Sequence, residues 1–560
     1  PYKLIKRAKM NYISEMENTD ISVTLKAVNA LQETPWRVHK EMAEVLQFAY
    51  DNSLQLDKLP PANDLPYPPR VHEEATDAEK KENGAAYAHV HTQNRKFISQ
   101  RLAVLQVLNL ANKFKDFNEL YFPHDLCSRG RAYPKPHYLN PQGPSYVRSL
   151  LEFSEGKPVM TVEQVEYICI IGANAYGKDK LPLSERIDWA WENEEMFVEI
   201  ANNWKTDKRW QEADAPFEFL RFCFEWRDMD EFGGQGYISH LPINLDATCS
   251  GLQHFSALLR DQEGGFNVNL TKHKERQDVY GEVARKAKAS IKADLYDPKK
   301  AVLAQAALDL GVDRKLCKRP VMIVPYSGTF KACMKYVQEY YEDLVDAGVA
   351  MPLSGFDVDF RLVPYVARKV WDSIDLNVVA AREAMDFITK VARLVTKNED
   401  PLPFMWSTPT GFVVQQAKYK MDKHVVRTWL DGSCIKVEYL YDSKELDTNK
   451  NAQSLSPNYI HSMDAAHLQL TINKALEKAD MSFCMIHDSF GVHAADMPVF
   501  LNDCIKPAFY EMYEDGTALQ KFLDEVMPLI PEKHREKIPP LPTLGSLDLS
   551  EVLESEFFFS

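Results

Sequence analysis

Two short apolar segments, far apart in the sequence, each lead to an aspartate. The first, Leu241–Leu245, is typical of a buried strand; Asp246 ends it, and small residues and then helical spacing follow. The second, Phe483–Ile486, has a possible returning strand at Phe490–Val492, which puts Asp488 at the tip of a hairpin. The pattern therefore predicts two carboxylates, each presented at the end of a strand.

Two carboxylates on two strands suit two-metal phosphoryl transfer. In that chemistry, anionic oxygens hold two cations roughly 3.5–4 Å apart; one activates the nucleophile and the other stabilises the leaving group. The small residues from Ala247 to Gly251 leave room for a metal and a bulky anionic ligand. An aspartate at a strand end is also a common helix N-cap, so two unrelated turn aspartates stay open as the alternative.

A further segment carries four residues at intervals of four, namely Arg314, Lys318, Met322 and Tyr326. On one helix these would share a broad face. An arginine fork and a lysine point charge on that face suit a triphosphate, with Tyr326 near the sugar and base. A basic surface helix with a buried tyrosine is the alternative. Pro320 lies inside the segment, where it can kink the axis.

The tetrapeptide Ser128-Arg129-Gly130-Arg131 combines two cations with a glycine. The glycine would let the backbone approach a phosphate while both guanidinium groups fork onto it. A solvated basic turn is an equally good interpretation from the sequence alone.

Composition limits the class of protein. The 560 residues can bury a large core and form about three to four domain-sized units. A net charge of −15 argues against a simple nucleic-acid binder, although the field inside a cleft can differ from the average. The nine cysteines include no CxxC pair, which fits a reducing compartment. The chain shows no targeting segment and starts at Pro1 instead of Met, which suggests a fragment or processed chain.

Other segments give coarser predictions. Residues 1–55 and 265–297 have helical patterns, and prolines between 60 and 69 indicate a linker. A helix over 92–118 would turn Leu102 inward and Arg101 outward. Alternation between Ile435 and Tyr441 predicts a β-ribbon with a polar tip near 442–451.

Six blocks of the sequence resemble the single-subunit DNA-dependent RNA polymerases of bacteriophages and mitochondria, in the order of that family. The resemblance runs from about Lys3 to the last residue. Departures occur at Cys127 and Ser128, where the family usually has an acid and an aromatic, and at Pro325 and Ser327, which flank Tyr326. The blocks are PHDLCSRGRAYP (123–134), the 241–261 stretch, DRKLCKRPVMIVPYSG (313–328), PNYIHSMDAAHL (457–468), IHDSFG (486–491) and ESEFFFS (554–560).

The resemblance implies an α+β, mainly helical chain with the right-hand polymerase fold and a small antiparallel palm sheet. It also implies that the N-terminal promoter-binding domain is missing. The implied parts are a thumb remnant (1–59), a linker and helix leading into the palm (60–118), the first part of the palm (119–262), the fingers with a specificity-loop-like ribbon at 429–455 (263–461), and the second part of the palm with a C-terminal tail that folds back near the active site (462–560).

The resemblance also assigns roles to residues. Asp246, the backbone of Ala247 and Asp488 would hold two Mg²⁺ ions, and Arg314 and Lys318 would bind the triphosphate. Tyr326 and His461 would place the sugar, and Gly251 stands where related DNA polymerases carry a glutamate that crowds the 2′ position. Arg129 and Arg131 would contact the RNA–DNA hybrid. Tyr280 would lie near the nucleotide, His487 would orient the hairpin or the primer end, and Asp464 would support the site without binding metal.

The implied function is DNA-templated RNA synthesis from ribonucleoside triphosphates by a monomer that does not bind membranes. Its partners would be the DNA template and the RNA product, in a host bacterial cytoplasm for a phage enzyme or in a mitochondrial or plastid matrix. Two rivals stay open: a catalytically inactive nucleic-acid-binding remnant, and a DNA polymerase of the related right-hand family.

Overall fold

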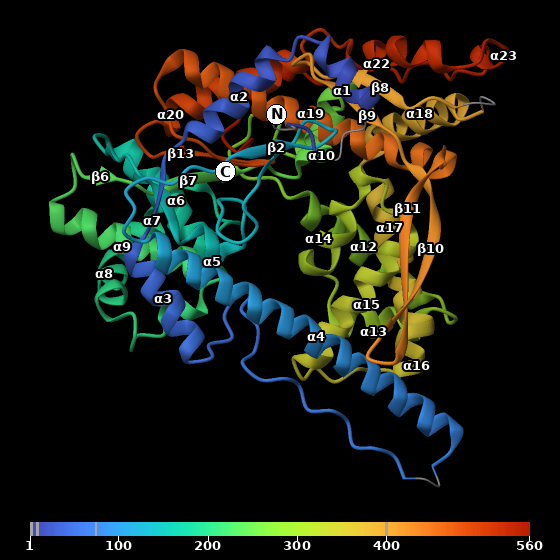
Figure 1. Cartoon of the computed structure of the whole chain (residues 1–560), viewed down its shortest axis with the longest axis horizontal. Coiled ribbons are helices and arrows are strands. Elements are labelled where there is room, and N and C mark those ends of the chain that lie inside the picture. Colours follow the sequence, from blue (N-terminus) through green and yellow to red (C-terminus); the bar gives the residue numbers. More distant parts are fainter. Residues whose placement is uncertain (1–3, 7–9, 73–74, 398–400) are drawn as a thin grey trace.

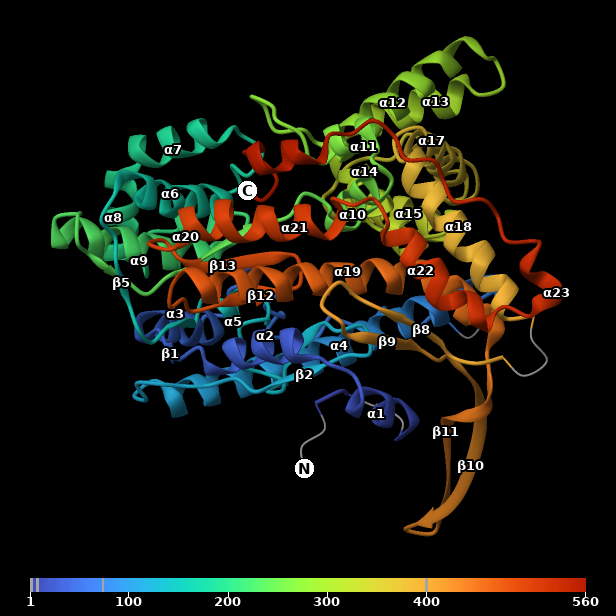
Figure 2. The ribbon, with the colours of Figure 1, turned by 90° about the horizontal axis from the view of Figure 1, so that it is seen from above.

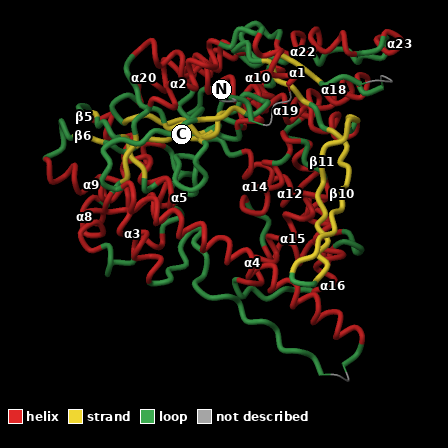
Figure 3. Tube along the Cα trace, in the orientation of Figure 1, coloured by secondary structure: helices red, strands yellow, loops and turns green. Residues whose placement is uncertain are grey.

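The chain folds into a mainly helical body with several small antiparallel sheets (Figures 1 and 3). The computed structural model describes residues 4–6, 10–72, 75–397 and 401–560; Lys3, where the resemblance begins, lies outside them. The expectation of an α+β, mainly helical fold is confirmed. None of the helices in these residues combines the length and the apolar character that crossing a bilayer requires.

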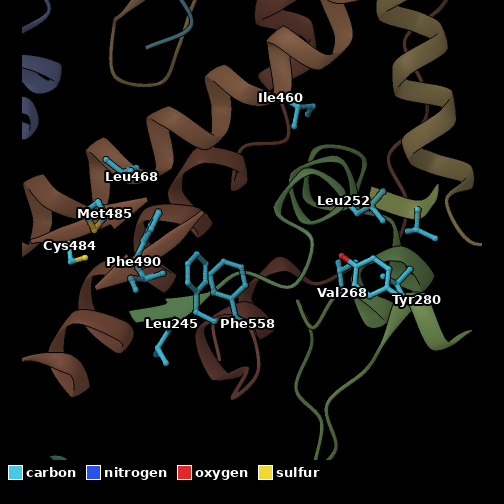
Figure 4. Packing of buried hydrophobic residues seen from close by; sticks show 14 of the residues in the cluster. Leu245, Leu252, Val268, Tyr280, Ile460, Leu468, Cys484, Met485, Phe490 and Phe558 are labelled. Carbon is cyan, nitrogen blue, oxygen red and sulfur yellow. The ribbon is translucent and has the colours of Figure 1, made fainter. Parts of the chain in front are cut away.

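The sheet at the centre has three antiparallel strands in the order β12 (Cys484–Ile486), β13 (Ser489–His493) and β7 (Pro242–Asp246). The predicted hairpin is therefore correct, with Asp488 in the two-residue loop that joins β12 to β13. His487, the other loop residue, has a φ of 55°. Phe490 is in register with Leu245 and its ring lies 4.9 Å from that of Phe559, within the buried core around the sheet (Figure 4).

Two helices place further residues beside this sheet. The predicted helix after Asp246 is α10 (Ser250–Leu259), and all of its residues are buried. It packs against α19 (Thr448–Lys478), which crosses the whole body (Figure 2). Helix α19 contains a proline, Pro457, in its interior. The core of the molecule thus surrounds the strands that carry the two aspartates.

One side of the sheet is covered by the helices between 145 and 232, by the helix at 40–51 and by the strands that flank them (Figure 1). Trp36 lies in the region that was expected to be helical, but it belongs to a strand, where it is buried. The elements are β1 (Trp36–Val38), α3 (Lys40–Asp51), α5 (Ser145–Arg148), β4 (Leu151–Phe153), β5 (Lys157–Pro158), α6 (Val162–Tyr176), α7 (Leu183–Glu192), α8 (Glu194–Asn203), α9 (Pro216–Phe232) and β6 (Ile238–Ser239).

The helices of residues 262–395 form a second lobe, which lies at the right of Figure 1. The single helix expected across Arg314 to Tyr326 is not continuous. It ends at Met322, and a separate 3₁₀ turn, Val324–Tyr326, carries the tyrosine. The helices of the lobe are α11 (Gln262–Asn267), α12 (Val279–Ala293), α13 (Ala301–Leu310), α14 (Arg314–Met322), α15 (Phe330–Asp346), α16 (Gly355–Asp357), α17 (Val363–Asp375) and α18 (Val379–Val395).

The long helix α4 (Asp77–Phe114) extends away from the body (Figure 1). Its predicted inward and outward faces were partly wrong. Leu102 is 57% exposed, whereas Arg101 folds onto the proline-rich segment and donates a hydrogen bond to the carbonyl of Pro61 (3.0 Å). The reason is that the linker between α3 and α4, not a second helix, covers this part of α4.

The ribbon of β10 (Tyr419–Leu430) and β11 (Ser433–Leu446) stands away from the body (Figure 2). A β-ribbon was predicted, but its bounds and its polar tip were wrong. The turn is Asp431-Gly432, where both residues have positive φ, and the exposed Trp429 and Leu430 precede it. An Asp-Gly pair with two positive φ values is a hairpin turn whose twist matches the strands.

The C-terminal end of the chain packs against the central sheet, and further helices and strands complete the fold. The terminal residues Phe557–Phe559 are buried, and the backbone N–H of Ser560 donates to the carbonyl of Asp246 (3.1 Å). The remaining named helices and strands are α1 (Met10–Glu17), α2 (Ser22–Glu33), β2 (His124–Leu126), β3 (Ala132–Pro134), β8 (Phe404–Ser407), β9 (Val413–Gln416), α20 (Met497–Val499), α21 (Lys506–Tyr513), α22 (Ala518–Val526) and α23 (Glu532–Arg535).

Acid is expected to destabilise this fold through its buried histidines. Burial lowers the pKa of His124, His467 and His493 to about 4 in each case. Below the unfolded pKa of roughly 6.5, the unfolded chain binds protons that the folded chain does not, which costs about 1.4 kcal/mol per histidine and pH unit. Burial raises the pKa of Asp464 to about 7, so the folded chain binds this proton before the unfolded chain does and gains stability as the pH falls. This gain cancels the loss from about one histidine.

The measurement is urea unfolding between pH 7 and pH 5. We expect the free energy of unfolding to fall steadily below pH 6.5. A free energy of unfolding that stays constant over this range would contradict the expectation. Replacing the exposed His89 by glutamine serves as the control and should leave the profile unchanged.

Candidate active site

The two predicted aspartates lie next to each other on the central sheet. Asp246 is in register with Ser489, the residue after Asp488. The N–H of Ala247 donates to the carbonyl of Asp488 (3.0 Å), and the hydroxyl of Ser250 donates to Oδ2 of Asp488 (3.2 Å). Backbone pairing between two distant segments therefore fixes both carboxylates at one edge.

The two carboxylates face a cavity of about 550 Å³. Asp246 is exposed there, and burial together with the charge of Asp246 raises the pKa of Asp488. Two negative charges this close are costly without a cation, so the donor set fits divalent metal ions with oxygen ligands. The described residues hold no group of three or more acidic, histidine or cysteine ligands, so other oxygens would complete the coordination.

Cations line the same cavity from the second lobe. Arg314 and Lys318, on the first two turns of α14, both reach it. Nε of Arg314 donates to Oδ2 of Asp278 (2.7 Å), and its guanidinium lies 5.1 Å from the ring centre of Tyr280. Lys318 is exposed and pairs with no carboxylate in the described part of the chain. Arg314 is thus held in place, while Lys318 can reach a ligand.

A tyrosine, a histidine and a glycine meet beside these cations. The rings of Tyr326 and His461 lie 4.5 Å apart between their centres. A Cβ atom placed on Gly251 would lie 2.7 Å from Cβ of Pro325 and 3.4 Å from the hydroxyl of Tyr326. The structure therefore brings Gly251, Tyr326 and His461 together, as the predicted sugar site requires. Pro325, which departs from the family pattern, packs directly onto Gly251.

His461 is held in one form by Arg129. Nη1 of Arg129 donates to Nδ1 of His461 (2.9 Å), so the ring proton is on Nε2. Burial and the neighbouring arginines Arg131 and Arg129 lower the pKa of His461 to about 2. A neutral imidazole with a fixed Nε2–H is a hydrogen-bond donor, which suits the hydroxyl group of a sugar.

The sequence suggested that Arg129 and Arg131 fork onto a phosphate, but in the structure both contact side chains of the protein. Nε of Arg131 donates to Oδ2 of Asp464 (3.1 Å), and its Nη2 also contacts that oxygen. Asp464 is buried, and Nε2 of His467, three residues on, donates to the carbonyl of Ile505 (2.9 Å). Asp464 therefore orients Arg131, as its predicted supporting role requires, and both arginines are directed towards α19.

Some residues of the site were not found from the sequence. Asp278 caps α12 and holds Arg314, and Ser250 contacts Asp488. An aspartate just before a helical pattern is an N-cap signal, but nothing in the sequence places that cap beside Arg314. Tyr280, predicted near the nucleotide, is buried under Arg314, and His487 packs edge-on against Tyr133 (4.8 Å between ring centres).

The backbone conformation of Ser327 is expected to lower the free energy of unfolding of the chain. Ser327 follows Tyr326 with a φ of 58°, a left-handed conformation that costs a residue other than glycine roughly 1–2 kcal/mol. Replacing Ser327 by glycine should therefore raise the free energy of unfolding by up to about 1 kcal/mol, as measured in urea. Ser454→Gly, inside α19, should lower it by a similar amount. If Ser327→Gly and Ser454→Gly changed the free energy of unfolding by the same amount and in the same direction, the backbone at Ser327 would not be strained.

Comparisons with known proteins agree with the geometry. Residues 159–538 match the family model described as DNA-dependent RNA polymerase. The chain belongs to this family of polymerases. It is 31% identical to the DNA-directed RNA polymerase of Enterobacteria phage T3, over all of this chain and 67% of that protein. It is also 31% identical to DNA-directed RNA polymerase 1, mitochondrial, of Arabidopsis thaliana, over 96% of this chain and 54% of that protein.

The polymerase chain thus spans about two thirds of the phage relative and about half of the plant one. Among solved structures, the POL domain of Pol1 from M. smegmatis, in complex with DNA primer-template and dNTP, aligns over 90% of this chain and 68% of that chain, with a TM-score of 0.41 and 11% identity. The family assignment depends on the sequence matches.

Proposed function

We propose that this chain extends RNA on a DNA template, using ribonucleoside triphosphates. The observation that supports this most directly is the composition of one cavity. Asp246 and Asp488 line it from the palm sheet, and Arg314 and Lys318 line it from α14. Carboxylates on one side and cations on the other suit a nucleotide whose triphosphate lies between them.

The reaction is transfer of a nucleotidyl group. The 3′-hydroxyl of the RNA attacks the α-phosphate in line, the new P–O bond forms, and pyrophosphate leaves. Bound at Asp246, Asp488 and the backbone of Ala247, two Mg²⁺ ions would supply activation of the hydroxyl and neutralisation of the leaving group. The protein itself positions the triphosphate through Arg314 and Lys318, and the Asp278 contact keeps the Arg314 guanidinium in place before the nucleotide arrives.

Selection of ribose would come from the contact of Gly251, Tyr326 and His461. Because Gly251 has no side chain, Pro325 and the Tyr326 hydroxyl can pack close to its backbone. The Nε2–H of His461 and the phenolic hydroxyl are then free to hydrogen-bond a sugar. Binding that rewards a 2′-hydroxyl rejects a deoxyribonucleotide, because the polar groups of the site would be left unpaired.

Two exposed elements would guide the nucleic acid. Helix α4 and the β10–β11 ribbon both extend away from the body (Figures 1 and 2). The ribbon would enter a DNA groove as a two-stranded reader. We further propose a monomer of phage or organellar origin, with the predicted palm and fingers boundaries from residue 119 onwards. Since α4 and not residues 10–59 extends furthest, α4 would take the part of the thumb.

The test is primer extension on a preassembled RNA–DNA scaffold with Mg²⁺. We expect extension with ribonucleotides and much less with deoxyribonucleotides. Equal extension with both would favour the DNA-polymerase rival. Scaffold binding by the folded chain without any extension would favour the inactive remnant.

A further inference from the structure

Another arginine lines the cavity that the cations of α14 also line. Arg276 lies in the segment before α12 and is half-buried. Its neighbours in the cavity wall include Arg314 and Lys318. The sequence gives no pattern that singles out Arg276, and the proposed nucleotide transfer does not yet use it.

Arg276 is held by a backbone carbonyl. Its Nη1 donates to the carbonyl of Asp179, which also accepts from Nη2 of Arg186 (2.7 Å). Arg186 is fully buried, and its other partners are the carbonyl of Leu181 and the side-chain oxygen of Asn174. Neither guanidinium forms an ion pair with a carboxylate in the residues that the structure describes. Among the described residues, both guanidinium groups therefore bond directly to neutral oxygens, while the carboxylate of Asp179 is near enough to favour their charged forms.

The positive charge here is costly in the free protein. Burial and the charge of Arg314 lower the pKa of Arg276, and burial and the charge of Arg276 lower the pKa of Arg186 to about 10. Cations that repel each other at the edge of an open cavity are stabilised when an anion binds between them. The carboxylates Asp246 and Asp488 line the same cavity and would repel the anion, so it would bind beside Arg276, Arg314 and Lys318.

We propose that Arg276 binds the β- and γ-phosphates of the incoming nucleotide and the pyrophosphate that leaves, together with Arg314 and Lys318. This inference rests on the proposed function. A guanidinium with one Nη group held by a carbonyl keeps its other N–H groups for phosphate oxygens. Arg276 would thus act on the leaving group, while Asp246 and Asp488 act at the reacting phosphate.

The test compares Arg276→Gln and Arg276→Lys with Arg285→Gln in the full chain. Arg285 is the matched control, because it is exposed on α12 and pairs with Glu282. With RNA on the scaffold, Mg²⁺ and pyrophosphate, the reverse reaction shortens the RNA. We expect Arg276→Gln to raise the KM for pyrophosphate about tenfold, as expected for a lost charge-assisted hydrogen bond, and Arg276→Lys to restore part of the affinity.

A purely structural role for Arg276, as a support for the 177–182 turn, would lower the melting temperature and leave the KM for pyrophosphate unchanged. That result would overturn the proposal. So would a weaker affinity for the scaffold with an unchanged KM for pyrophosphate, because it would place the phosphate contact on the nucleic acid.

A second measurement needs neither a variant nor a working polymerase. Phenylglyoxal modifies arginine side chains, and mass spectrometry reports each site. Pyrophosphate with Mg²⁺ should protect Arg276 several-fold and leave Arg285 unprotected. Protection in a chain that does not extend RNA would support the anion site and refute the proposed function. Extension of RNA without protection of Arg276 would refute the anion site alone.

Discussion

Replacing Asp488 by asparagine is expected to abolish RNA extension on the scaffold and to leave the fold intact. The amide keeps the shape of the hairpin tip but loses the negative charge that faces Asp246. We expect the rate to fall by roughly 10³-fold or more, which corresponds to about 4 kcal/mol of transition-state stabilisation. The stability should not fall, because burial and Asp246 raise the pKa of Asp488 and so make its ionised form costly at neutral pH.

Single-nucleotide incorporation in rapid-mixing experiments gives the rate, and thermal unfolding gives the stability. Asp480→Asn is the matched control, since Asp480 is an exposed aspartate just before the same hairpin. It should extend RNA at the rate of the parent. An Asp488→Asn variant that retains more than about a tenth of the activity would exclude Asp488 as an essential metal ligand.

Replacing Gly251 by alanine is expected to impair both the use of ribonucleotides and the stability. The added Cβ would lie 2.7 Å from Cβ of Pro325, closer than two carbon atoms can approach, so the turn with Tyr326 must move. Overpacking of this kind costs about 1–3 kcal/mol of stability. Because Tyr326 contacts His461, we expect kcat/KM for ribonucleotides to fall about 10²-fold.

Steady-state kinetics with ribo- and deoxyribonucleotides, and unfolding in urea, measure these effects. Gly84→Ala in α4 is the control, because a Cβ there meets nothing within 4 Å. Alanine should stabilise that helix slightly. If Gly251→Ala were as stable and as active as the parent, the tight packing of Pro325 on Gly251 could not be what shapes the sugar site.

The parts of the site that the sequence predicted are those set by local chemistry. Phe483–Ile486 and Phe490–Val492 are apolar runs on either side of a two-residue turn, and the hairpin follows from that pattern. Helix α10 follows from its apolar spacing in the same way. The pairing of β13 with β7 needed the family resemblance, since strand partners that distant are not encoded by periodicity.

The remaining differences have tertiary causes. Pro325 and Ser327 mark a break, but the extent of α14 depends on how the turn packs against Gly251. Leu102 is exposed because a linker and not a helix covers α4. Arg131 is directed inward because Asp464, over three hundred positions away, lies opposite it. Burial and ion pairing across the chain decided each of these outcomes.

Helix α19 joins the exposed ribbon to the sugar site, and its interior proline sets how the two can move. Pro457 cannot donate a hydrogen bond to the carbonyl of Gln453, one turn earlier, so the helix is weakest just before His461. The ribbon enters α19 upstream of that point and His461 follows it. Bending of the ribbon as it follows DNA would therefore be absorbed at Pro457. The accuracy of sugar selection would then not depend on which DNA sequence the ribbon contacts.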